Sequence, residues 1–167
     1  AQYYFSKIIN IDSKYSTPAQ YYFSHIAYEN GLYNSAMEGF EKLVLDEKFG
    51  AIVPYYIAQI HFFQKNYKKL ISYVLPMLNK VIPSRKSELN RLLAESYYRT
   101  GQYNEAINFF NDFLSEQEEV DISTYFLLGN AYFLEKEYLD AIKFLEMVIE
   151  APDSTMQYSS YILGASY

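Results

Sequence analysis

Residues 97–107 read YYRTGQYNEAI, and this stretch decides the fold of the chain. Aromatic residues precede a short polar break, and Tyr103 and Ala106 follow the break at a spacing of three. The same arrangement returns along the chain, since a tyrosine follows a short polar break at 33, 67, 103 and 138, at intervals of 34, 36 and 35 residues. A nearly constant period of this length predicts a stack of repeated units that share one continuous core.

Further positions repeat in the same register. Three residues after each tyrosine lies Ala36, Leu70, Ala106 or Ala141, and four residues further lies Phe40, Val74, Phe110 or Leu145. About nine residues before each tyrosine lies a small residue, namely Ser24, Ala58, Ala94 or Gly129, and Gly164 fits the same position. We expect the small residues to let two helices approach closely and the large ones to fill the space against the next pair.

The spacing within each period is helical, because apolar residues recur at intervals of three and four. Two such segments joined by a short turn predict a helix hairpin. Gly31 and Gly101 lie where a first helix must end with a positive φ. Pro76 falls inside a second helix and predicts a kink or a shortening between residues 70 and 86. The predicted side-chain caps of helix starts are Thr17, Asn34, Asn104, Asp121, and Asp153 or Ser154.

Residues 97–107, 128–132 (LGNAY) and 138–142 (YLDAI) resemble the central signature of the tetratricopeptide repeat (TPR) family. The resemblance extends over the whole chain. It implies an all-α fold, a right-handed α-solenoid of stacked antiparallel helix hairpins with about ten helices. Residues 49–59 (FGAIVPYYIAQ) and the Pro76 segment are also similar to long TPR proteins of the bacterial cell envelope. That second resemblance favours the periplasm or the envelope over the cytoplasm.

We expect a single array over residues 1–167. Residues 1–14 are predicted to be the second helix of a preceding repeat, and residues 157–167 the first helix of a following one. Between them, full repeats are expected at 17–50, 51–86, 87–121 and 122–156. Because both ends lie inside apolar-periodic segments, we expect the chain to be a piece of a longer protein. Solenoid ends need polar caps, so the face near Tyr161, Ile162 and Tyr167 is expected to self-associate.

Composition excludes several classes of function. The net charge is −6 and the pI is about 4.9, which argues against a general nucleic-acid surface. No apolar run approaches the roughly 18 residues that a membrane-spanning helix needs. The absence of cysteine excludes disulfides and thiolate metal sites.

Residues that could carry chemistry are sparse. His25 and His61 lie one repeat apart, not at the spacing of a helical metal-binding pair, and His61 falls in a packing position. No Ser/His/Asp set or glycine-rich phosphate loop is present, so we expect no catalytic residue, cofactor or metal. Two charge clusters are read as solvated surface, one acidic and one basic: Glu116, Glu118, Glu119 and Asp121; and Lys65, Lys68, Lys69, Lys80, Arg85 and Lys86.

The TPR resemblance implies that the first helices line a concave groove that binds a peptide or a protein segment. Off the packing positions, the first helices carry a row at i, i+4 and i+7, which we call the first-helix row. Its members are Tyr21, His25, Tyr28, Tyr55, Gln59, Phe62, Arg91, Glu95, Tyr98, Phe126, Asn130 and Phe133. Such mixed aromatic and polar surfaces suit protein contacts. The alternative is that the rings pack against one another or against a neighbouring helix.

TPR domains that clamp a chaperone's C-terminal carboxylate use Lys and Asn on this surface. Here only Asn130 agrees in type and Arg91 supplies the one cation, so we expect no carboxylate clamp. Two functions follow from the sequence. The first is a non-enzymatic scaffold that binds a protein segment in the groove, in a bacterial cell-envelope assembly. The alternative is a structural or sensory segment of a larger regulatory protein, without a peptide ligand of its own.

Overall fold

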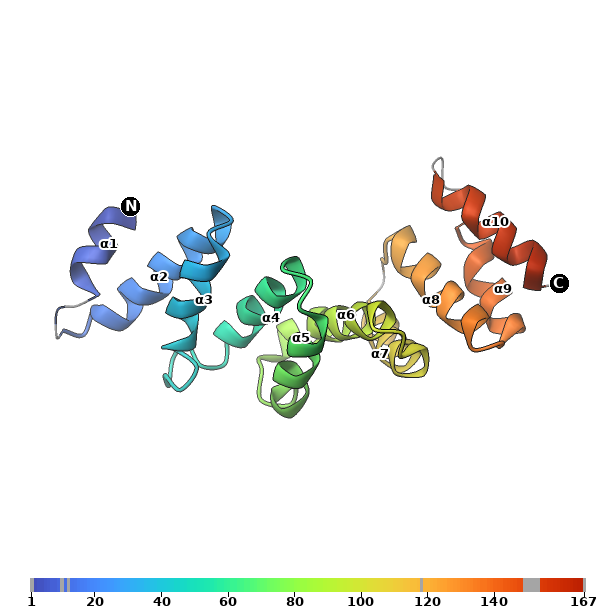
Figure 1. Ribbon diagram of the computed structural model, residues 1–167. Helices are drawn as coiled ribbons and strands as arrows, with labels where there is room; N and C mark the ends of the chain where they lie inside the picture. Colours follow the sequence, from blue (N-terminus) through green and yellow to red (C-terminus); the bar gives the residue numbers. More distant parts are fainter. Residues whose placement is uncertain (1, 10, 12, 118, 149–153, 167) are drawn as a thin grey trace. The chain divides into compact units, whose positions relative to one another are not determined.

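The structure is a computed structural model that describes residues 2–9, 11, 13–117, 119–148 and 154–166 (Figure 1). Over these residues the secondary structure is helical throughout, with ten α-helices, one 3₁₀ turn and no strand. The predicted all-α fold with about ten helices is therefore confirmed for this part of the chain. The helices form two compact units, Ala1–Lys86 and Ser87–Tyr167, which are described one at a time.

Unit 1 holds one leading helix and two hairpins. Helix α1 spans Gln2–Ile8, and the first hairpin pairs α2 (Ser16–Glu29) with α3 (Tyr33–Glu41). In the second hairpin, α4 (Val53–Phe63) is followed by α5 (Tyr67–Val74) and the 3₁₀ turn η1 (Leu75–Met77). Helix α6 (Pro83–Arg99) begins in unit 1 and continues into unit 2.

Unit 2 continues the same pattern. Helix α6 is followed by α7 (Tyr103–Ser115), and α8 (Ile122–Leu134) is followed by α9 (Tyr138–Glu146). Helix α10 (Ser154–Ser166) contacts both α8 and α9. Each second helix begins at the repeating tyrosine, so the sequence period and the helix boundaries coincide.

The repeated packing positions are buried as the sequence predicts. Ala36, Leu70, Ala106 and Ala141 are 0% exposed, and the large residues four positions later are at most 1% exposed. Gly129 shows why a small residue is needed, because a Cβ there would lie 2.8 Å from Leu145 Cγ. Gly164 differs, since a Cβ at that position meets no atom within 4 Å. The tight crossing therefore holds at Gly129 and not at Gly164.

All four hairpin turns close with the same backbone device. The residue two before each tyrosine has a left-handed backbone, with φ of +72° at Gly31 and +78° at Gly101, as predicted. The residue after it donates its N–H to a carbonyl five positions back, as in Leu32 N to Ala27 O at 2.8 Å, which is the Schellman arrangement. Lys65 and Lys136 take this position in the other two turns, with φ of 58° and 66°. Sequence did not predict these two strained lysines.

Three of the predicted helix caps are wrong. Helix α2 begins at Ser16, before Thr17, and its N-cap is Tyr15. Asn34 and Asn104 lie one residue inside α3 and α7, whose N-caps Leu32 and Gln102 make no side-chain cap hydrogen bond. Their turns are already closed by the Schellman arrangement, so the asparagine side chains are left for other contacts.

Two local predictions are confirmed. Asp121 caps α8, since its carboxylate accepts hydrogen bonds from Ser123 N and Thr124 N. Helix α5 ends at Val74, and Pro76 lies in the 3₁₀ turn that follows. A proline lacks the N–H that the next helical turn requires, which explains the short second helix here.

Candidate functional site

The first-helix row lies on helices α2, α4, α6 and α8, and its side chains are half-buried except for the buried Asn130. Six members belong to unit 1 and six to unit 2, so the two parts are treated as separate surfaces. Many of these side chains contact one another, which the sequence period alone does not predict. Their contacts decide what each surface offers to a ligand.

In unit 1, hydrogen bonds join the row across two repeats. Tyr28 Oη donates to Gln59 Oε1 at 2.6 Å, and Gln59 Nε2 donates to Tyr55 Oη at 2.8 Å. Burial raises the pKa of the Tyr28 hydroxyl to about 12, with a smaller effect from Tyr55. The hydroxyl therefore stays protonated at neutral pH and acts as a donor. Both oxygen and nitrogen of the Gln59 amide are engaged, which fixes its orientation.

Aromatic packing surrounds this polar chain. Tyr21 stacks on Phe49, with ring centroids 4.6 Å apart, and its hydroxyl donates to Tyr56 Oη at 3.5 Å. Burial, the Tyr56 hydrogen bond and nearby tyrosines raise the pKa of Tyr21 well above its usual value. The His25 ring meets Tyr56 edge-on at 5.2 Å and lies 3.8 Å from Glu29. Phe62 instead packs on Tyr67 in its own hairpin.

Sequence missed two residues of this surface. Tyr56 is 8% exposed and contacts Tyr21, His25 and Tyr28, yet its column holds Leu92 and Leu127 in later repeats, which is typical of plain packing. Only its hydroxyl signals a polar role. The guanidinium of Arg85 lies 4.3 Å above the Tyr55 ring. Arg85 was assigned to a solvated basic cluster, whereas it sits in the first turn of α6.

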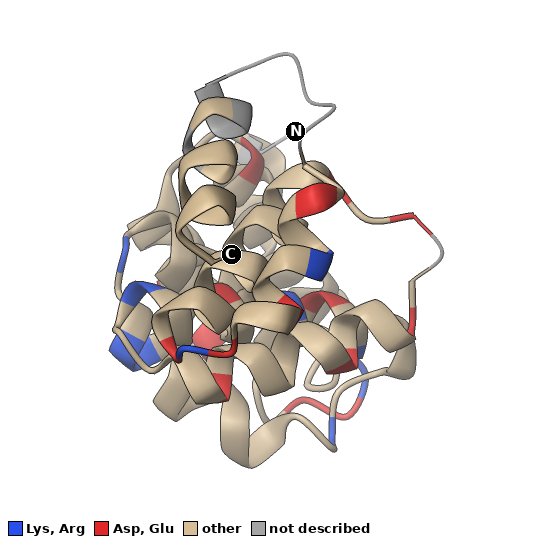
Figure 2. Cartoon of the chain, turned by 90° about the vertical axis from the view of Figure 1, so that its right-hand side faces the viewer, with Lys and Arg blue, Asp and Glu red and all other residues tan. Residues whose placement is uncertain are grey.

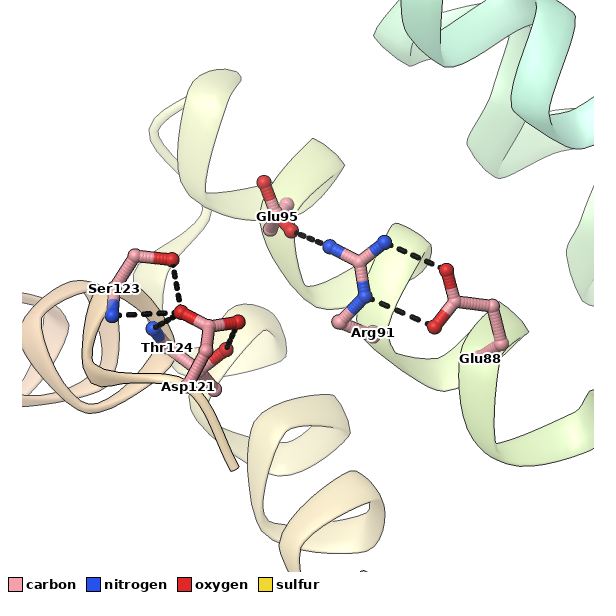
Figure 3. Close-up of polar contacts among 6 residues, drawn as sticks. All are labelled: Glu88, Arg91, Glu95, Asp121, Ser123 and Thr124. Carbon is pink, nitrogen blue, oxygen red and sulfur yellow. Dashed lines mark hydrogen bonds and ion pairs between the residues drawn. The ribbon is translucent and has the colours of Figure 1, made fainter. Parts of the chain in front are cut away.

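In unit 2, the row centres on an ion-pair cluster (Figure 3). Arg91 donates twice to Glu88, at 3.0 Å from Nε and 2.6 Å from a terminal nitrogen, and its other terminal nitrogen donates to Glu95. The Glu88 hydrogen bond is the main cause that raises the pKa of Arg91, against the opposing effect of burial. Burial raises the pKa of Glu95 and outweighs the Arg91 and Arg99 charges. Asp121, at the start of α8, is hydrogen-bonded to Ser123 and Thr124 of its own helix (Figure 3), and its charge raises the pKa of both Arg91 and Glu95.

The same interhelical contact appears in both units. Asn130 donates its side-chain N–H to Tyr98 Oη, and this pair is equivalent to Gln59 and Tyr28 in unit 1. A second pair is also repeated at the hairpin turns, where Asn34 Oδ1 accepts from Gln64 at 3.1 Å and Asn104 donates to Glu135 at 2.9 Å. Within each unit, therefore, two consecutive repeats are joined by a tyrosine–amide contact and by an asparagine contact. Phe133 packs on Tyr138, and Phe126 is half-buried.

Outside the row, the buried polar atoms that have no hydrogen-bond partner among the described residues include Nδ1 of His61 and the hydroxyl of Tyr73. Burial lowers the pKa of His61. Glu116, Glu119 and Asp121 are exposed along the segment that joins α7 to α8 (Figure 2), while Glu118 lies outside the described residues. Within the described ranges, no three His, Cys, Asp or Glu side chains are grouped to hold a metal ion. None of the helices described is long and apolar enough to cross a bilayer.

Comparison with known proteins supports the repeat assignment. The family model for the anaphase-promoting complex, cyclosome, subunit 3 matches residues 74–148. No curated protein sequence matches the chain. Among solved structures, the MamA RS-1 ArsTM double mutant aligns with a TM-score of 0.75 and 13% identity, over 90% of this chain and 88% of that one.

Two further solved structures are similar to this chain in fold. MamA MSR-1 C2 has a TM-score of 0.70 at 12% identity and covers 92% of this chain and 90% of its own. The nearly identical TPR-like repeats of a Podosopora anserina kinesin light chain have a TM-score of 0.59 at 17% identity, with 94% and 88% coverage. At these identities the likeness shows the fold, and the fold is that of stacked TPR-type hairpins.

Proposed function

Since the chain is built of tetratricopeptide-type repeats, we propose that its first-helix row binds an extended segment of a partner protein, and that the chain is a non-enzymatic scaffold for protein–protein contacts. The observation that carries this proposal is the repeated tyrosine–amide contact, Tyr28 with Gln59 and Tyr98 with Asn130. It holds the aromatic side chains of consecutive first helices in fixed positions. A surface fixed in advance loses little side-chain entropy when it binds.

The unit 1 part of the row offers mainly aromatic area. Its hydroxyls and amide are already hydrogen-bonded to one another, so a ligand does not have to satisfy them. The rings of Tyr21, Tyr28 and Tyr55 remain half-exposed. This combination favours an extended segment with apolar or aromatic side chains, which would gain contact area without leaving polar groups unpaired.

The unit 2 part has a different charge pattern. Arg91 is hydrogen-bonded to two carboxylates on its own helix, which occupy three of its five N–H donors. A partner's terminal carboxylate would have to compete with Glu88 and Glu95 for this cation. This supports the prediction that the row is not a carboxylate clamp, and it favours a neutral or basic segment at this part.

The proposal is tested by capture of partner proteins on immobilised chain. The Tyr55→Ala/Phe126→Ala variant removes one ring from each part of the row and should lose the partner while its helical circular dichroism stays unchanged. Tyr15→Ala/Tyr161→Ala is the matched control, because these two rings are 61% and 73% exposed and lie outside the row. The control should retain the partner. Equal capture by all three chains would contradict binding by the row.

The alternative function is a structural or sensory segment of a larger regulatory protein. It predicts that no partner depends on the row, so the same capture experiment separates the two. A cell-envelope location stays part of the proposal and rests on the resemblance of residues 49–59 and the Pro76 segment.

A further inference from the structure

Charge is strongly segregated between the two units. Unit 1 has ten basic and six acidic residues, a net charge of +4, whereas unit 2 has four basic and 14 acidic residues, a net charge of −10. Between residues 48 and 87 there are seven Lys or Arg and no Asp or Glu. The overall charge of −6 hides this opposition. Two copies of the chain therefore attract each other when unit 1 of one meets unit 2 of the other.

Two equivalent second helices show where such a contact would form. Along α5 and its C-cap, residues 68, 71, 72 and 75 share one outward face, which we call the α5 face; on α9 the face at the same repeat positions is 139, 142, 143 and 146. In both helices the first and last of these positions are exposed and the isoleucine is half-buried. The α5 face consists of Lys68, Ile71, Ser72 and the C-cap residue Leu75, and the α9 face of Leu139, Ile142, Lys143 and Glu146.

Apolar exposure distinguishes these two faces from their counterparts. Leu139 is 85% exposed and Leu75 is 41% exposed. On α9 a hollow is lined by Leu139, Ile142 and Met147 together with Lys143 and Glu146. The same positions on α3 and α7 hold polar residues at both ends, including Asn34 and Glu41 on α3 and Asn104 and Asn111 on α7. Among the described second helices, only the α5 and α9 faces have an apolar residue at one end and a charged residue at the other. The two charges, on Lys68 and Glu146, are opposite in sign.

We propose that the α9 face of one copy docks antiparallel on the α5 face of a second copy. In that orientation Leu139 meets Leu75, Ile142 meets Ile71 and Glu146 meets Lys68. The contact is heterologous, since each copy uses two different faces, so association continues beyond a dimer unless the geometry closes a ring. It uses second helices and leaves the first-helix row uncovered, and its success or failure is independent of the proposed partner binding.

The test is sedimentation velocity of the full chain over a range of concentrations at low and high salt. The wild-type chain should exceed its monomer mass of 19.6 kDa as concentration rises, and high salt should reverse this. Lys68→Glu and Glu146→Lys should each weaken association by about tenfold or more. The double variant Lys68→Glu/Glu146→Lys restores opposite charges across the contact and should regain association to within about threefold.

Glu38→Lys on α3 and Lys42→Glu at its C-cap are matched controls, because they make the same charge changes at exposed positions away from both faces. They should associate like the wild type. A monomeric wild type at all concentrations in low salt would overturn the proposal and leave the α9 face to a different protein. Failure of the double variant to recover, with helical content intact, would also overturn it.

Discussion

At the scale of single residues, the four hairpin turns share one backbone conformation although different residue types adopt it. Each hairpin needs one left-handed residue, and glycine provides it in two turns while Lys65 and Lys136 provide it in the others. A side chain in this conformation loses about 1–2 kcal/mol relative to a right-handed one. The lysines are therefore local weak points in the second and fourth hairpins.

Replacing either lysine with glycine should stabilise the chain. Lys65→Gly and Lys136→Gly relieve the strain of the left-handed backbone. The larger entropy of glycine in the unfolded chain offsets part of the stability gained, so we expect a net gain of about 0.5–1 kcal/mol for each variant. Urea denaturation measures the gain as a higher midpoint. Lys68→Gly, inside α5, is the control and should lose about 1 kcal/mol instead. A loss of stability at Lys65→Gly would contradict the account of the turn.

Removing the Arg91 side chain should destabilise the fold, because two carboxylates lose the cation to which they are hydrogen-bonded. Arg91→Met leaves Glu88 and Glu95 partly buried without their cation, and we expect a loss of about 1–3 kcal/mol near neutral pH. Because burial already raises the pKa of Glu95, that group favours the folded state at low pH and loses its contribution as the pH rises through its folded pKa.

The destabilisation by Arg91→Met should therefore shrink at acid pH, where Glu95 becomes protonated. Chemical denaturation of the wild type and the variant at several pH values measures this. Arg91→Met/Glu95→Gln is the control, since it removes one of the stranded charges and should recover part of the stability. A pH-independent difference would show that the cluster acts through packing alone.

At the scale of helices, the sequence period predicted where second helices begin, because a buried column and a turn repeat together. It failed at three predicted caps, Thr17, Asn34 and Asn104, whereas Asp121 does cap α8. Thr17 and Asn34 are common cap types, but the caps were decided by where the backbone turns, and the Schellman closure makes an asparagine cap unnecessary. The tyrosine–amide contacts could not be predicted either. They depend on which faces of successive first helices meet, which a one-dimensional period does not specify.

The two helical glycines test the predicted close crossing. Gly129→Ala would place Cβ 2.8 Å from Leu145 Cγ, and we expect a net loss of about 1–3 kcal/mol from overpacking. Gly164→Ala meets open space and should gain about 0.5–1 kcal/mol from better helix propensity. Thermal or urea unfolding should show lower stability for Gly129→Ala and higher stability for Gly164→Ala than for the wild type. Equal gains at both sites would mean that α8 and α9 do not cross tightly.

The start of α8 depends on one carboxylate. Burial alone would raise the pKa of Asp121, but hydrogen bonds from Ser123 and Thr124 together hold it below its usual value. A lowered folded pKa gives stability that is present above the unfolded pKa and is lost as the pH falls through the folded one. Asp121→Ala should cost about 1 kcal/mol at pH 7, and the difference should disappear well below about pH 4.

Asp121→Asn separates the cap from the charge. Asparagine is nearly as good a cap as aspartate, so this variant should retain most of the stability at neutral pH and lack the acid dependence. Stability of Asp121→Asn as low as that of Asp121→Ala would mean that the negative charge, and not the cap hydrogen bond, stabilises α8.

At the scale of the whole molecule, the sequence predicted the repeat architecture, and the comparisons agree with the fold. It could not predict how fully the row contacts itself, because Arg85 was read as solvated surface and Tyr56 and Glu88 were not singled out. Charge segregation was also hidden, since the net charge averages two units of opposite sign. The sequence period predicts the helix boundaries, whereas the side-chain pairs between repeats depend on which helix faces meet in the folded chain.

The central claim is that partner proteins meet the chain on the first-helix row. Site-specific photo-crosslinking tests it most directly, with a benzophenone amino acid placed at Tyr55 or Phe126 in the row, or at Tyr15 outside it. We predict that the two row positions crosslink to the same partner protein and that Tyr15 does not. Crosslinking from Tyr15 alone, with both row positions silent in a folded chain, would contradict the claim.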